Sequence, residues 1–101
     1  MFLGQVLEQL GDEAIAAETL ISLSDLALMV DVERTAGRFG QSVPIYTVDA
    51  TRRFAALAGD EDWLALMTAL ERAENPGAAC LRQMLQWSLR ADAGTIAGEE
   101  H

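Results

Sequence analysis

The chain has 101 residues, of which 16 are acidic and 7 are arginines, so its net charge is −9, and half of its residues are hydrophobic. This composition is typical of one folded domain, and the length excludes a second one. The negative charge argues against nucleic acid or an anionic membrane as a partner of the whole molecule, because phosphate surfaces would repel it. The single cysteine, Cys80, excludes an internal disulfide.

The chain shows no targeting or membrane-spanning pattern. No basic residue precedes Glu8, which interrupts the first apolar run before it resembles a signal peptide. The longest uncharged stretch, residues 39–48, contains Pro44 and falls short of the ~20 apolar residues that span a bilayer. The sequence therefore predicts a cytoplasmic protein with no membrane partner.

Apolar residues recur with a helical period in the first part of the chain. The spacing predicts helices over residues 2–10, 13–22 and 25–39, separated by glycine and capping residues. The third of these begins with five consecutive apolar residues, 26–30. A helix without a polar face is usually buried, so this segment is expected at the centre of a helical bundle.

A fourth helix is predicted over residues 43–58. Ser42 can cap it, and Pro44 is tolerated in its first turn because the proline donates no bond that the helix needs there. Apolar residues follow at steps of three and four. Residues 43–48 alone would also fit a strand, and the sequence leaves this alternative open.

Two further helices complete the predicted fold. The fifth follows Asp60, and its expected buried face consists of Trp63, Met67 and Leu70. The sixth starts at the capping pair Asn75 and Pro76 and is predicted to end at about Ala91. The result is an all-α fold, a compact bundle-like domain of five to six short helices over residues 1–91, with a disordered acidic tail over residues 92–101.

The sixth helix carries more apolar surface than one buried face requires. Either this helix is central, or part of it meets a second chain. Trp87 is the candidate anchor for such a contact, because tryptophan is enriched in protein interfaces. The alternative is that Trp87 fills the core of a small domain.

The residue inventory predicts a protein that is not an enzyme and holds no cofactor or metal. The only histidine is His101 in the predicted tail, so the sets needed for histidine-assisted catalysis, zinc or haem are missing, and no phosphate-binding glycine loop is present. The acids of residues 60–62 fit a helix cap better than a catalytic site. Cys80 lies among apolar residues and is expected to be a packed structural thiol.

Charge is segregated along the chain. Residues 1–33 contain seven acids and no base, whereas residues 34–58 contain four arginines and one acid, Asp49. We expect the four arginines to form one patch. They could pack near the acidic first helices or offset helix dipoles, or they could bind an anion: a phosphate, an acidic partner or the acidic face of a second copy. The four are Arg34, Arg38, Arg52 and Arg53.

The middle of the chain resembles a known family of regulators. Residues 40–54, a glycine and a capping serine followed by a helix with an aromatic, a small residue and basic positions, are similar to the start of the second helix in ribbon-helix-helix repressors. Residues 20–23 would then stand for the β-ribbon and residues 25–39 for the first helix. The resemblance implies a nucleic-acid-binding regulator that uses the arginines of residues 34–53, with Ser22 on the ribbon.

The function that the sequence favours is a small, non-enzymatic regulatory or adaptor protein of bacterial type. It is expected to act through protein–protein contact as a homodimer. Two alternatives stay open: the nucleic-acid-binding regulator, and an acidic decoy whose residues 1–33 imitate a phosphate surface toward a basic partner. The predicted partner-binding residues are Arg34, Arg38, Arg52, Arg53 and Trp87.

Overall fold

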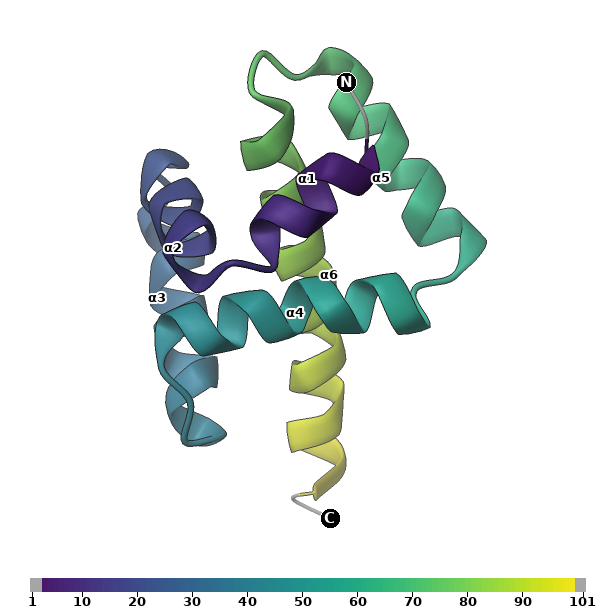
Figure 1. The fold of residues 1–101 in the computed structure, drawn as a ribbon. Coiled ribbons are helices and arrows are strands. Elements are labelled where there is room, and N and C mark those ends of the chain that lie inside the picture. Colours follow the sequence, from purple (N-terminus) through teal and green to yellow (C-terminus); the bar gives the residue numbers. More distant parts are fainter. Residues whose placement is uncertain (1–2, 100–101) are drawn as a thin grey trace.

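Six α-helices make up the part of the chain that the computed structural model describes, which is the backbone of residues 3–99 and the side chains of residues 4–94 (Figure 1). No strand occurs in this part, so the predicted all-α fold is confirmed. In chain order the helices are α1 (Leu3–Leu10), α2 (Glu13–Ser22), α3 (Leu26–Arg38), α4 (Val43–Leu57), α5 (Asp60–Arg72) and α6 (Pro76–Glu99).

The helices begin where capping side chains precede them. The carboxylate of Asp12 accepts hydrogen bonds at the start of α2, and that of Asp25 does so at the start of α3. Ser42 caps α4, and its hydroxyl accepts the backbone N–H of Ile45 at 3.3 Å. The open question about residues 43–48 is therefore resolved in favour of a helix. Gly40, with φ of +65°, makes the preceding turn in a conformation that favours glycine.

Helix α6 lies at the centre of the molecule and contacts each of the other five helices (Figure 1). Its buried stripe includes Leu81, Met84, Leu85 and Ser88, all with no exposed surface. The surplus of apolar surface on this helix is thus explained by its central position. Helix α4 crosses α6 and packs Tyr46, Ala50 and Phe54 into the same core.

Helix α6 also continues beyond the predicted end at Ala91. It runs to Glu99, so the prediction of a disordered tail from Asp92 onward is wrong for residues 92–99. Asp92 is only 4% exposed. A lone acid near the end of a sequence looks like solvent-exposed tail, but here the carboxylate is bound by an arginine from another helix. Residues 100–101 lie outside the described part.

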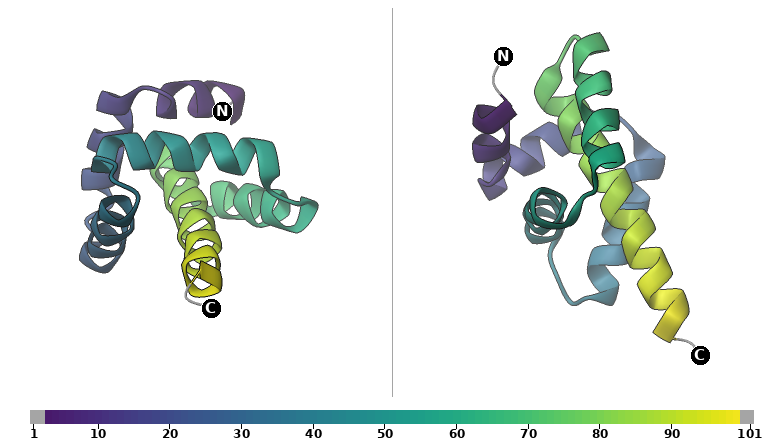
Figure 2. Two further views of the ribbon diagram at one scale, coloured as in Figure 1. Left: turned by 90° about the horizontal axis from the view of Figure 1, so that it is seen from below. Right: turned by 90° about the vertical axis from the view of Figure 1, so that its right-hand side faces the viewer.

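Two predictions about burial are also wrong. Helix α3 lies at the edge of the fold and packs on α4 and α6 through one face (Figure 2), so its apolar start is not the centre of a bundle. Leu28 is buried there, whereas Leu26 is 77% exposed. In α5, Met67 is 52% exposed and Leu66 takes the buried place instead. One step along a helix rotates a side chain by about 100°, and the contact with α6 selects the face that contains Leu66.

The β-ribbon implied by the resemblance to ribbon-helix-helix repressors is absent from the described part of the chain. Residues 20–22 lie within α2, and the turn after them leads directly into α3. Between residues 3 and 99, no helix combines the length and apolarity that a membrane crossing requires.

Candidate functional site

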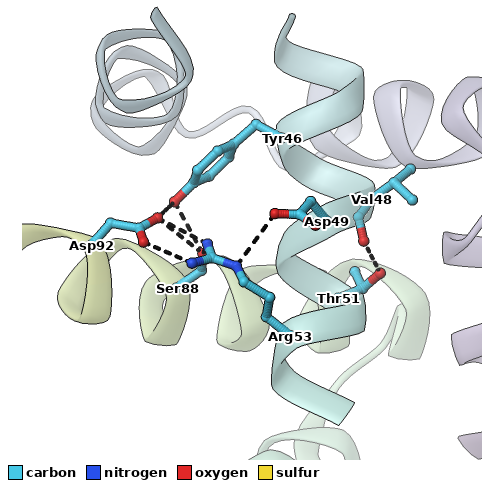
Figure 3. Close-up of polar contacts among 7 residues, drawn as sticks. All are labelled: Tyr46, Val48, Asp49, Thr51, Arg53, Ser88 and Asp92. Atoms are coloured by element: carbon cyan, nitrogen blue, oxygen red, sulfur yellow. Dashed lines mark hydrogen bonds and ion pairs between the residues drawn. The ribbon is translucent and has the colours of Figure 1, made fainter. Parts of the chain in front are cut away.

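A cluster of polar side chains lies between α4 and α6 (Figure 3). Arg53 of α4 donates two hydrogen bonds to the carboxylate of Asp92 on α6, from Nη1 at 2.7 Å and from Nη2 at 2.9 Å. The hydroxyl of Tyr46 donates to the same carboxylate at 2.5 Å, and Ser88 Oγ lies 3.0 Å from the Tyr46 oxygen and accepts from Arg53. Asp49 lies one turn before Arg53, with its Oδ2 3.4 Å from Arg53 Nε. The five residues form one continuous network.

The ionisation states in this network follow from burial and hydrogen bonding. Burial and the hydrogen bond to Asp92 raise the pKa of Tyr46 to about 12, so the phenol stays neutral at neutral pH. Burial alone would raise the pKa of Asp92, but hydrogen bonds from Arg53, Tyr46 and Ser88 together lower it below the ordinary value of 3.8. The hydrogen bonds to Asp92 raise the pKa of Arg53. Asp92 is therefore a carboxylate held by a guanidinium.

This arrangement favours a structural role for the network over a role in general acid–base catalysis. A carboxylate with a lowered pKa is a weak base, and a phenol with a raised pKa is a weak acid. The hydroxyl of Ser88 has no exposed surface, and its oxygen is already bound to Arg53. The network joins α4 to α6, as the side chains in Figure 3 show.

The four arginines predicted to form one patch lie in three different places. Arg53 belongs to the polar network between α4 and α6. Arg52 lines a hollow beside Asp12 and Glu13, which agrees for this residue with packing near the acidic first helices. Arg34 and Arg38 share a separate hollow between α3 and α6.

The hollow that holds Arg34 and Arg38 contains a third arginine, Arg90 of α6. We call it the basic hollow, and its volume is about 340 Å³. Leu89 and Ala93 supply an apolar part of its lining. The remaining lining residues are Asp31 and Thr35 of α3.

Trp87 makes its contacts within the chain. Its ring meets that of Phe54 edge to face with the centroids 5.4 Å apart, and its Nε1 donates to Asp62 Oδ2 at 3.1 Å. Trp63 meets Phe54 from another side at 5.0 Å. The structure therefore places Trp87 against the core, half-buried, as the second of the two interpretations expected.

The apolar start of α3 forms a separate surface feature. Leu26 is 77% and Val30 41% exposed, and Ala27 between them is exposed as well. We call these three residues the α3 apolar patch. Ile21, in the last turn of α2 just before the connecting turn, is 68% exposed.

Cys80 is buried, and burial raises the pKa of its thiol to about 12. The prediction of a packed structural thiol is confirmed, because a thiol in this state is protonated and inaccessible. Among the described residues, no three histidine, cysteine, aspartate or glutamate side chains lie close enough together to hold a metal ion.

Sequence reasoning missed two of these features. The network could have been suspected from spacing, because Asp49 and Arg53, and likewise Ser88 and Asp92, are four residues apart on one helix face. Arg90 carries no such signal, since only the contact of α3 with α6 brings it to Arg34 and Arg38.

Comparison of the chain with known proteins found no similar protein. No family model matches the chain, and neither a curated protein nor a solved structure shows a match to it.

Proposed function

We propose that this protein is a small, non-enzymatic regulatory or adaptor protein that acts through protein–protein contact and forms a homodimer in the cytoplasm. The observation that carries the proposal is the α3 apolar patch. Five consecutive apolar residues have the composition of a buried helix, yet Leu26 is 77% exposed in the single chain. A partner that covers the patch would remove this surface from water.

A second copy of the chain fits the α3 apolar patch. In a dimer with a two-fold axis through the patch, Leu26 of one copy can lie against Val30 of the other, and the same contact occurs twice. Removing this apolar surface from water favours association, against the freedom that two copies lose when they bind. Exposed Ile21 can extend the contact beyond the turn.

The polar network supports a binding role rather than catalysis. Its hydrogen-bonding groups are used to hold α4 against α6, and this keeps the central helix in place beneath the surfaces of α3.

The dimer is tested by measuring the mass of the protein in solution. At about 50 µM the wild type is expected to be a dimer by light scattering or sedimentation, and the double variant Leu26→Glu/Val30→Glu a monomer. A glutamate in the first turn of a helix is favoured by the helix dipole, so the substitution at Leu26 leaves α3 intact.

The matched control is Leu64→Glu/Met67→Glu, which changes two exposed apolar residues of α5 in the same way. This variant is expected to remain a dimer. A wild type that is monomeric at this concentration, or equal effects of the two double variants, would show that the α3 apolar patch is not a dimer interface.

A further inference from the structure

The basic hollow concentrates positive charge on an otherwise acidic protein. It contains three of the seven arginines of a chain whose net charge is −9. Arg38 and Arg90 form no ion pair with any side chain in the described part. Arg53 and Arg82, in contrast, pair with Asp92 and Asp25. The charges of the hollow are therefore available to a ligand.

The one ion pair within the hollow is weak. Arg34 Nη1 lies 3.8 Å from Asp31 Oδ1, and the two side chains are 61% and 56% exposed. Solvent-exposed pairs of this kind contribute little to stability. A carboxylate of a ligand can therefore replace Asp31 as the partner of Arg34 at little cost in free energy.

The spacing of the arginines favours an elongated ligand over a single small anion. Arg34 and Arg38 are one helical turn apart on α3, which places their Cβ atoms about 6 Å from each other. Carboxylates four residues apart on a helix have the same spacing. Leu89 and Ala93, also one turn apart, offer an apolar strip on α6 beside these charges.

The hollow also continues along the contact between α3 and α6. A second hollow of about 460 Å³ shares Asp31, Leu89 and Arg90 with it and extends to Asp25, Ala27, Leu28 and Gln86. Its far end therefore carries the carboxylate of Asp25 and meets the α3 apolar patch at Ala27, so the acidic segment is expected at the end nearer the arginines. Figure 2 shows α3 and α6 next to each other on the side away from α1. A chain segment can occupy this groove, whereas a lone phosphate would fill only one part of it.

We infer that the basic hollow binds an acidic amphipathic helical segment of a partner protein. Carboxylates at successive turns of the segment pair with Arg34, Arg38 and Arg90, and an apolar side chain between them rests on Leu89 and Ala93. Arginine suits this role because its planar guanidinium binds a carboxylate through two parallel hydrogen bonds. The inference rests on the proposed function, since it gives the adaptor its second partner.

Nucleic acid is the less favoured occupant. The net charge of −9 repels a long polyanion, whereas a short peptide with few carboxylates meets mainly the hollow itself. The test therefore includes a DNA duplex as a competitor.

The probe is a labelled helical peptide of about 14 residues, roughly 21 Å long, with glutamates four residues apart flanking leucines. Binding to the full chain is measured by fluorescence anisotropy, and the site is located by amide chemical shifts. The expected result is saturable binding that shifts Thr35, Leu89 and Ala93. A peptide with glutamine in place of each glutamate is expected to bind at least about tenfold more weakly.

Substitutions of the arginines test whether they are the residues that bind the peptide. Arg38→Glu/Arg90→Glu should weaken peptide binding at least about tenfold, and Arg38→Gln/Arg90→Gln should weaken it less, with unchanged circular dichroism in both. The matched control Arg52→Glu/Arg72→Glu reverses two exposed arginines outside the hollow and should leave binding within about twofold. Equal weakening by this control, shifts confined to other helices, or preferential binding of the duplex would overturn the inference.

The experiments distinguish a failure of the dimer proposal from a failure of the peptide-binding proposal. A neutral variant of the same patch, Leu26→Gln/Val30→Gln, should still bind the peptide, because it keeps all three arginines of the hollow and adds no carboxylate that could pair with Arg34. A dimeric wild type that does not bind the peptide contradicts the inference alone. A monomeric wild type that binds it contradicts the homodimer alone.

Discussion

At the scale of single residues, Asp92 is a buried carboxylate that joins α6 to α4. Its carboxylate is 4% exposed and accepts hydrogen bonds from Arg53 and Tyr46. Removing a carboxylate from water is costly, so it is tolerated here only because a guanidinium and a phenol replace the lost solvent. These hydrogen bonds join this turn of α6 to α4.

Replacing Asp92 should destabilise the fold in a pH-dependent way. Asp92→Asn leaves the Arg53 guanidinium with only the more distant carboxylate of Asp49, and we expect the free energy of unfolding at pH 7 to fall by about 2–4 kcal/mol in urea titrations. The control Asp31→Asn, at an exposed ion pair, should cost less than about 0.5 kcal/mol.

The sign of the pH effect follows from the lowered pKa of Asp92. Below about pH 4 the unfolded chain takes up a proton at this position before the folded chain does, so protons favour unfolding. The stability difference between wild type and Asp92→Asn should therefore be full at neutral pH and shrink as the pH falls below about 4. A difference that stays constant down to about pH 2 would contradict an ionised Asp92.

At the scale of elements, α6 is the helix on which the others are assembled. It contacts all five other helices, and its fully buried stripe runs from Cys80 to Ser88. Beyond this stripe, the turn that carries Asp92 adds a polar attachment to α4. The helix is thus held by apolar packing along its first half and by the polar network further on.

Shortening α6 should reveal the contribution of that turn. A chain that ends at Ala91 loses Asp92, whereas one that ends at Gly94 keeps it. With both chains amidated at the carboxyl end, we expect the shorter one to be less stable by about 2 kcal/mol or more, measured by urea unfolding with tryptophan fluorescence. Equal stabilities would mean that the network adds nothing to the packing of α6.

At the scale of the whole molecule, charge and apolar surface are separated. The α3 apolar patch lies at the start of α3 and the basic hollow toward its end, so one helix presents two kinds of surface. Two copies with a charge of −9 each repel one another, whereas an acidic peptide is attracted to the arginines.

The two proposed contacts should therefore respond to salt in opposite directions. Between about 50 and 500 mM sodium chloride, screening should strengthen the homodimer, because it weakens the repulsion between like-charged copies. The same change should weaken peptide binding to the basic hollow by about tenfold or more, because it screens the attraction. Over one salt series, sedimentation measures the dimer and fluorescence anisotropy measures peptide binding. If both contacts strengthened or both weakened with salt, the assignment of one to apolar contact and the other to charge attraction would be contradicted.

The sequence by itself determined the helices, their order and most of their ends. Helical periodicity and capping residues such as Asp12 and Ser42 act locally, so they can be read without knowing the fold. It also indicated that Cys80 is a packed thiol. For the candidate site, it identified Arg34 and Arg38 but grouped them with Arg52 and Arg53.

Only the tertiary structure decided which faces are buried and which charges meet. Leu66 rather than Met67 faces α6, Leu26 is left in solvent, and Asp92 is drawn into the interior by Arg53. Arg90 joins Arg34 and Arg38 although more than fifty residues separate them in the sequence. The physical reason is that these outcomes depend on the packing of one helix against another, and no local pattern of residues encodes that contact.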